Sequence, residues 1–311
     1  MTRCASRSRQ PARPASAWPC KATEFDMPRI HPDHMRRCRG VTLLEMVIAM
    51  IVVSIVVAAT VFFANPVQQA IDLTARAELT DIADNTLQRM GREVRLALPN
   101  SVRTNGSVME FIPVRTAGRY RTTSSGACGS ATDELAFGTS DSCFKSVGAI
   151  PDDATVTAND FLVLNNYGTG FTDQNAYDTA PANPNRAAIV SLTGGNTVNF
   201  GATTFVASSH DSPGKRFYIV MKPVAYVCDL TAGTIKRYSG YAFTTNLDPA
   251  TISGGASALI ASDVTGCSFD YSATVSAGVG LLALTLTLAK ATKTGNEKVT
   301  LYHSVHVNNV P

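Results

Sequence analysis

Residues 36–64 read RRCRGVTLLEMVIAMIVVSIVVAATVFFA, and this stretch decides how the rest of the chain is organised. Three arginines precede Gly40, and the apolar run that follows carries a single charge, Glu45. A helix from Val41 to Ala64 would be about 36 Å long at ~1.5 Å per residue, enough to cross a hydrocarbon core of about 30 Å. The stretch therefore predicts one membrane-spanning helix with its basic end in the cytoplasm.

Two simpler interpretations leave part of this stretch unexplained. A secretory signal peptide has a shorter apolar region with a small residue after it, whereas here the small residue comes first. An uncut signal anchor explains the arginines and the span but not Glu45, because a carboxylate in a membrane segment costs ~2.5–3.5 kcal/mol at the helix centre and less near an end. If the chain is cut after Gly40, the free amine of Val41 lies one helical turn from Glu45 and attracts it strongly in a medium of low dielectric constant.

The segment GVTLLEMV, residues 40–47, resembles the prepilin cleavage and methylation motif of type IV pilins and of type II secretion pseudopilins. Gly40 matches the residue before the cut, Val41 the new N-terminus and Glu45 the assembly carboxylate. The family more often has phenylalanine where Val41 stands. The resemblance implies cleavage by prepilin peptidase, methylation of the new amine, and packing of the helix among other major and minor pilins in a helical filament.

Residues 1–35 are rich in Arg, Ser and Pro and are expected to be disordered rather than a domain. Met27 and Met35 offer shorter leaders, so we expect the natural start to lie downstream of Met1, and residues 1–40 to be removed as a leader. These residues hold 9 of the 27 lysines and arginines and 3 of the 24 acidic residues, which leaves 18 basic and 21 acidic residues and a net charge of −3. Charge therefore gives no indication of nucleic-acid binding.

Four of the seven cysteines lie beyond the leader: Cys128, Cys143, Cys228 and Cys267. An even set outside the membrane favours disulfides if the compartment is oxidising. Three pairings are possible, and we favour Cys128–Cys143 with Cys228–Cys267 because sequence neighbours close the smaller loops. A zinc site is the alternative, but no C-x-x-C pair exists and the spacings fit no zinc finger.

Beyond the span, Pro66 is expected to interrupt or kink the helix. Apolar residues then recur at steps of three to five, which predicts an amphipathic helix that ends at Pro99-Asn100. The predicted stripe consists of Ile71, Ala75, Leu79, Ile82, Leu87, Met90, Val94 and Leu98. It could pack on the chain's own head or against another copy in a coiled coil, and we favour the first.

The remainder of the chain has short β-branched or aromatic runs separated by clusters of Gly, Ser, Thr, Asn and Asp, the pattern of a β-rich domain. Leucines at 282, 284, 286 and 288 alternate with small residues, as in a strand with one buried face. Strands are expected at residues 107–113, 160–165, 187–193, 197–207, 216–221, 224–230, 234–238, 267–272, 280–290 and 297–307, and loops at 116–148 and 167–184.

The expected fold class is α+β, a long N-terminal transmembrane and amphipathic helix followed by a β-rich globular head, as in pilins. The expected domains are a leader (1–40), a transmembrane helix (41–64), an amphipathic helix (65–98) and a β-rich periplasmic head (99–311).

Segments beyond the motif are similar to minor pilins of the MSHA pilus biogenesis system, the MshO group. They include Arg76–Val102, Val224–Leu230, the Cys267-x-Phe269-x-Tyr271 segment and the C-terminal residues 306–311. This similarity implies a minor pilin of an MSHA-type type IV pilus, anchored in the inner membrane with its head in the periplasm. The J-type pseudopilin of type II secretion is the alternative in the same class, and a single-span periplasmic receptor or adhesin is the alternative of another class.

The head shows no pattern of an enzyme. His210-Asp211-Ser212 has the residue types of a catalytic triad, but adjacency in sequence is not triad geometry, and a polar turn is favoured. G-x-S-x-G, H-E-x-x-H and P-loop motifs are absent from the sequence. His303 and His306 alternate along an expected strand, and Asp152-Asp153 is typical of a turn rather than of a calcium loop. We therefore expect no catalytic residue, no metal and no cofactor.

Overall fold

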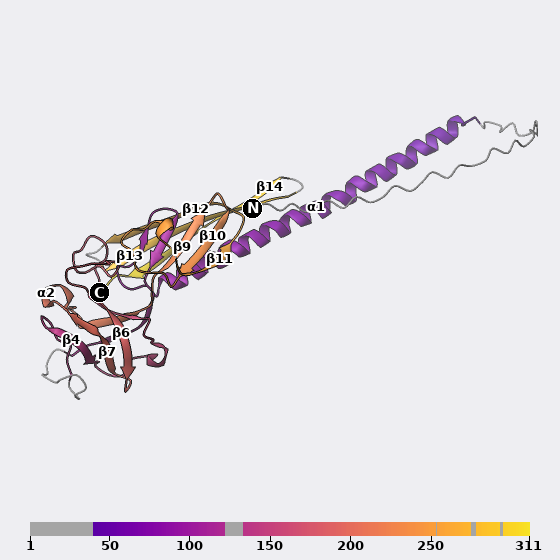
Figure 1. The fold of residues 1–311 in the computed structure, drawn as a ribbon. Coiled ribbons are helices and arrows are strands. Elements are labelled where there is room, and N and C mark those ends of the chain that lie inside the picture. The colour runs from indigo at the N-terminus through magenta and orange to yellow at the C-terminus, as the bar shows by residue number, and fades with distance from the viewer. Residues whose placement is uncertain (1–39, 122–132, 253, 275–277, 293–294) are drawn as a thin grey trace, which may run out of the picture. The chain divides into compact units, whose positions relative to one another are not determined.

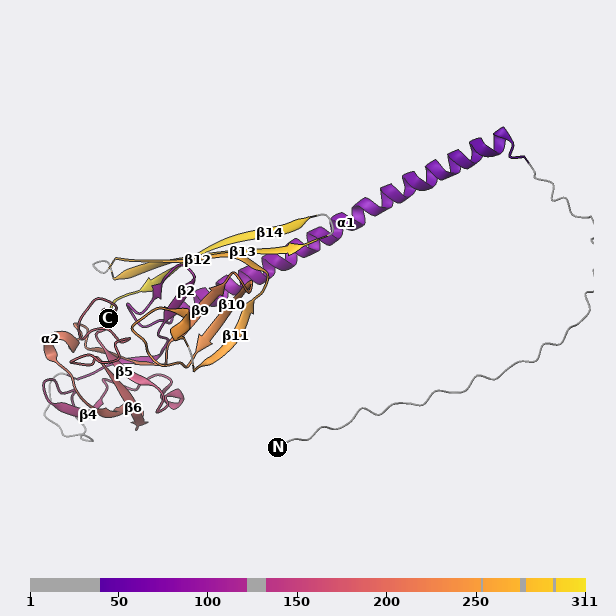
Figure 2. The same ribbon diagram turned by 45° about the horizontal axis from the view of Figure 1, so that its top comes forward.

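A computed structural model describes residues 40–121, 133–252, 254–274, 278–292 and 295–311. In these residues one long helix is followed by three antiparallel sheets, which confirms the predicted α+β class (Figures 1 and 2). Contacts divide the described chain into two units, with the division between Ala58 and Ala59. The head and the part of the helix that packs on it belong to the second unit.

Helix α1 runs from Leu43 to Val94 as a single element of 52 residues. The helix is continuous through Pro66, so the predicted interruption is wrong: a proline inside a long helix removes one backbone hydrogen bond, which the helix can accommodate without a break. The kink, which was the other expected outcome, stays a prediction. The helix also ends four residues earlier than predicted. Leu98 donates its backbone N–H to the carbonyl oxygen of Ile112 at 2.7 Å, so this segment pairs with the head instead of extending the helix.

The C-terminal part of α1 buries one stripe of side chains against the head, as predicted. Four predicted members within α1 are fully buried, and Ala75 is half-buried: the buried four are Leu79, Leu87, Met90 and Val94. Ala83, which the prediction omitted, is buried with them. They recur at steps of three and four, so they fall on one side of the helix. These residues share a core with strands of two sheets, and Ile82 packs at its margin. The buried part of the stripe therefore packs within the chain, as we favoured.

The three-stranded sheet consists of β12 (Val264–Thr274), β13 (Val279–Ala291) and β14 (Asn296–Asn308), in that order. Leucines 282, 284, 286 and 288 of β13 are all fully buried in the core shared with α1, as their alternation predicts. Figure 2 shows β13 and β14 running along α1. This face of the sheet thus packs in one core with the helix stripe.

The five-stranded sheet has the order β1-β2-β9-β10-β11. Its strands are β1 (Arg103–Thr104), β2 (Val108–Phe111), β9 (Val224–Asp229), β10 (Thr234–Ser239) and β11 (Ala256–Ala261). A short 3-10 helix, Pro249–Thr251, precedes β11. Met109, Phe111, Tyr226 and Ile235 contribute to the same core as α1, so the helix packs against two sheets.

The six-stranded sheet has the order β3-β8-β5-β6-β7-β4 and a core of its own. Its strands are β3 (Val114–Arg119), β4 (Ser140–Lys145), β5 (Phe161–Leu164), β6 (Arg186–Thr193), β7 (Thr197–Thr204) and β8 (Arg216–Val220). A 3-10 helix, Asp153–Thr155, and a short helix α2, Ala207–His210, lie in its connections.

The loop predicted at residues 116–148 is wrong in part, because β3 and β4 lie within or overlap it. Their sequences, VRTAGR and SDSCFK, have few β-branched residues, and pairing with β8 and β7 makes them strands. The loop predicted at 167–184 is confirmed.

At Gly91, α1 lies close to side chains of β14. A Cβ atom there would lie 2.9 Å from Nε2 of His303 and 3.1 Å from Cγ2 of Val305. Gly91→Leu is therefore expected to lower the free energy of unfolding by about 1–3 kcal/mol, the usual cost of overpacking a core. Denaturant unfolding of the full chain in detergent measures this. Thr80→Leu, on the exposed side of the same helix, is the control and should change little; equal losses for both variants would contradict close packing at Gly91.

Candidate assembly site at the start of the helix

Thr42 caps the N-terminus of α1. Its Oγ1 accepts a hydrogen bond from the backbone N–H of Glu45 at 3.3 Å, and its carbonyl oxygen accepts one from Met46 at 3.2 Å. Threonine followed by glutamate three positions later is the capping-box pattern. Sequence reasoning missed this role, although the signal T-x-x-E was present at residues 42–45.

The cap fixes the positions of the two groups expected to act in assembly. Because α1 begins at Leu43, Val41 stays outside the helix and Glu45 lies in the first turn. The backbone N–H groups of a first turn carry partial positive charge, which favours a carboxylate there. The motif therefore places the Glu45 carboxylate in the first turn, where the helix dipole stabilises a negative charge.

The candidate cleavage site is open in the described residues. Gly40 is exposed, and a Cβ added to it would meet nothing within 4 Å. Val41 is 64% exposed. An exposed, unpacked backbone at this bond is the form in which a protease can take up a chain.

The apolar segment after Glu45 is long enough to cross a membrane. Leu43–Phe62, 20 residues with a mean hydropathy of 2.6, has no buried residue. Such a helix is about 30 Å long at ~1.5 Å per residue, which equals the hydrocarbon thickness. Ser54 donates its hydroxyl to the carbonyl oxygens of Met50 and Ile51 at 2.8 and 2.9 Å, so it needs no outside partner.

The structure describes one of the two predicted disulfides. Cys228 on β9 and Cys267 on β12 form a disulfide with their Cα atoms 6.6 Å apart, and it joins the five-stranded to the three-stranded sheet. Cys143 is buried on β4. Cys128 lies outside the described residues, so the pair Cys128–Cys143 stays a prediction.

His210, Asp211 and Ser212 are not arranged as a triad. His210 is buried, its Nδ1 accepts from the backbone N–H of Val206 at 3.0 Å, and its Nε2 lies 2.7 Å from the carbonyl oxygen of Asp173. The imidazole is therefore neutral with its proton on Nε2. Asp211 accepts from Tyr120 at 2.6 Å and pairs with Lys215. The hydroxyl of Ser212 donates to the carbonyl oxygen of Pro311 at 3.4 Å, so the three side chains do not bond to one another, and the segment is a connection after α2.

The buried His210 is expected to make the stability of the head depend on pH. Burial lowers the pKa of its imidazole below the ordinary 6.5, while the nearby Asp173 opposes the shift. Just below pH ~6.5 the unfolded chain therefore takes up a proton on this histidine, whereas the folded chain does not. The contribution of His210 to the free energy of unfolding is complete above pH ~6.5 and is lost as the pH falls below it. We expect the free energy of unfolding to fall between about pH 7.5 and about pH 5.

His210→Gln is the matched variant for this prediction, because its amide oxygen can accept from Val206 without titrating. The variant should lose a clear part of the pH dependence when unfolding is followed at both pH values in detergent. An unchanged pH slope would show that His210 does not cause it.

The other polar candidates show no sign of a metal site. In the described part of the chain, no group of three or more His, Cys, Asp or Glu side chains could hold a metal ion. His303 faces Gly91 of the helix, whereas His306 is exposed on β14. Asp152 has a left-handed backbone and precedes a 3-10 helix, as expected for a turn.

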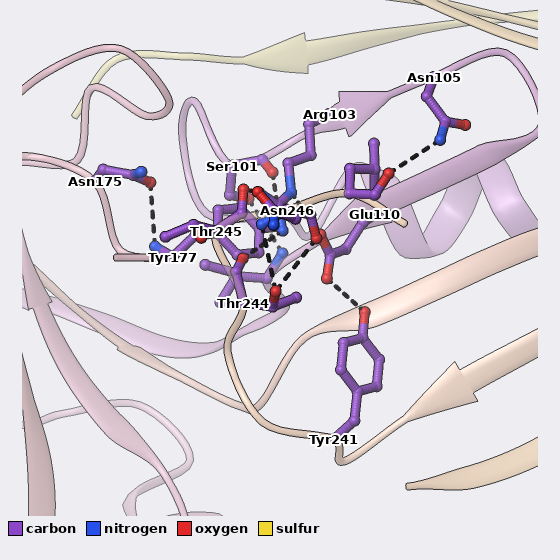
Figure 3. A network of polar contacts seen from close by, with 12 residues as sticks. Ser101, Arg103, Asn105, Glu110, Asn175, Tyr177, Tyr241, Thr244, Thr245 and Asn246 are labelled. Atoms are coloured by element: carbon purple, nitrogen blue, oxygen red, sulfur yellow. Dashed lines mark hydrogen bonds and ion pairs between the residues drawn. The ribbon is translucent and has the colours of Figure 1, made fainter. Parts of the chain in front are cut away.

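A buried polar network ties β1 and β2 to the loop after β10 (Figure 3). Glu110, fully buried, pairs with Arg103 and accepts from the hydroxyl of Tyr241 at 2.7 Å. Arg103 also donates to the carbonyl oxygens of Thr244 and Thr245 and covers the ring of Tyr177 at 3.7 Å. Burial raises the pKa of the Glu110 carboxyl, and the Arg103 guanidinium opposes this shift. These donors and acceptors are used within the protein, which fits a structural role.

Residues 35–61 match the family described as the prokaryotic N-terminal methylation motif. The match covers the arginines before Gly40, the capped helix start and most of the apolar span. No curated protein and no solved structure matches the chain. The motif, the apolar helix and the β-rich head together support a type IV pilin-like or pseudopilin-like protein, and the motif implies a structural rather than an enzymatic role.

Proposed function

We propose that this chain is a minor pilin that prepilin peptidase cuts between Gly40 and Val41 before it joins a type IV filament. The observation that carries the proposal is the methylation motif at residues 35–61, set directly before an exposed apolar helix long enough to span a membrane. That helix continues to Val94 and packs on the head. A chain with this arrangement can be anchored first and then drawn into a bundle of like helices.

Assembly depends on an ion pair between subunits. Among the described residues, no ion pair includes Glu45. Cleavage creates an ammonium at Val41, and a neighbouring subunit in the filament can supply it. Pairing of two opposite charges in an apolar bundle is strongly favoured over leaving one of them alone.

Two features support a periplasmic location for the head. Arginines 36, 37 and 39 favour a cytoplasmic N-terminal side for the span. The Cys228–Cys267 disulfide requires an oxidising compartment on the other side. We therefore propose a single-pass protein of the inner membrane that moves into the filament after processing.

The particular filament is proposed from sequence similarity. The segments that resemble the MshO group support an MSHA-type pilus, and the J-type pseudopilin of type II secretion is the second candidate because the same motif and helix serve both. A receptor or adhesin with a single span would share the anchor but would need neither cleavage nor Glu45.

Deletion and complementation in the native bacterium test these functions. Loss of surface filaments with normal protein secretion would support the pilus assignment. Loss of secretion with normal filaments would favour the pseudopilin. Normal filaments and normal secretion, with the leader still attached in the wild type, would overturn both.

A further inference from the structure

A polar pocket with a volume of about 530 Å³ lies at the junction of the six-stranded and five-stranded sheets. The chain crosses between these sheets twice, from β2 to β3 through Ile112-Pro113 and from β8 to β9 through Met221–Pro223. The two crossings are held together by a hydrogen bond from the N–H of Met221 to the carbonyl oxygen of Pro113 at 2.9 Å. Residues of both sheets line the pocket.

The pocket carries an excess of positive charge. Arg115, Lys222 and Arg237 line it, against one acid, Asp160. Arg115 pairs with Asp160 at 2.8 Å, and Arg237 pairs at 2.8 Å with Glu93 of α1. Lys222 is half-buried and has no ion pair or hydrogen bond with any residue that the structure describes. One cation at the pocket wall therefore remains uncompensated.

Two further donors face the same space. The side chains of Asn159 and Ser239 line the pocket, and neither makes a hydrogen bond within the described ranges. An ammonium, a hydroxyl and an amide together form a donor set for carboxylate or phosphate oxygens. Met221 and Val224 add apolar surface beside them. The volume falls in the range of about 300–1,000 Å³ that is usual for sites of small organic ligands, and it exceeds the needs of a bare ion.

We propose that this pocket binds a small organic molecule through a carboxylate or phosphate group, with Lys222 as its principal charged contact. The oxyanion lies against Lys222, Ser239 and Asn159, and the body of the ligand lies against Met221 and Val224. A ligand held in this way contacts both sheets and fastens their junction. The head would then carry a binding activity in addition to its place in a filament.

Calorimetric titration of the full chain in detergent tests this proposal, with glucuronate, inorganic phosphate and uncharged glucose as probes. At low salt, glucuronate or phosphate should bind saturably, and glucose at least about tenfold more weakly, since one charge-assisted contact is lost. Preference for glucuronate would indicate a carboxylate ligand, and preference for phosphate a phosphorylated one.

Lys222→Ala should weaken binding of the preferred anion about tenfold. Lys236→Ala is the matched control: it lies on β10 next to Arg237, is exposed, and points to the other face of the strand. Both variants should keep the wild-type unfolding transition. Absence of saturable binding by both anions, equal binding of glucose, or equal effects of the two substitutions would overturn the proposal.

Discussion

Glu45→Ala is expected to insert in the membrane normally but to enter filaments about a hundredfold less than the wild type. Insertion should not suffer, because the substitution removes the one charge from the apolar segment. Incorporation should fall because a neighbour's Val41 ammonium would be left in the helix bundle without its carboxylate. Breaking one side of a buried ion pair costs about 3–5 kcal/mol, which corresponds to two or more orders of magnitude. The amounts of protein in membranes and in sheared filaments measure the two steps separately.

Ser54→Ala is the control for this prediction. It also removes a polar group from the span, but that hydroxyl bonds only to carbonyl oxygens of its own helix turn. The control should reach filaments in wild-type amounts. Equal incorporation of Glu45→Ala and Ser54→Ala would contradict the ion-pair mechanism, although cleavage at Gly40 could still occur.

Loss of the Cys228–Cys267 disulfide is expected to have the largest effect on the stability of the head. The two cysteines are 39 residues apart in sequence, and closing a loop of this size stabilises a folded chain by about 4 kcal/mol on the chain-entropy model. The bond also joins two sheets that share one core with α1. The free energy of unfolding of the full chain in detergent should therefore fall by about this amount in Cys228→Ser.

The double variant Cys228→Ser/Cys267→Ser separates loss of the bond from loss of a single buried side chain. Its free energy of unfolding should lie close to that of either single variant, because each of the three lacks the same bond. A loss below about 1 kcal/mol would mean that the two sheets are held by the core alone.

The sequence is informative where a short pattern has one physical solution. The apolar run after Glu45 can only be a helix in lipid, and the alternating leucines of β13 can only have one buried face. The β3 and β4 segments lack such a pattern, and they become strands because β8 and β7 pair with them. The predicted end of α1 was too late for a similar reason. Leu98 would be buried either as the last residue of the helix or in the segment after it, and only its backbone hydrogen bond to Ile112 shows that it lies in that segment.

The functional residues also differ in whether the sequence alone could identify them. Gly40, Val41 and Glu45 are neighbours in sequence, so a linear motif finds them, and Thr42 could have been found by its capping pattern. The pocket at the sheet junction could not, because its cations come from β3, β10 and the β8–β9 crossing. Arg115, Lys222 and Arg237 are more than 100 residues apart at the extremes, and only the pairing of strands brings them together.

Mass spectrometry of the N-terminal peptide, from protein isolated from its own membranes, tests the central claim most directly. The proposal predicts a mature chain that begins at Val41, with or without a methyl group on its amine. A Gly40→Leu variant should keep its leader and serves as the uncut control. A wild-type chain that begins at Met1, Met27 or Met35 would contradict processing by prepilin peptidase and would favour an anchored receptor.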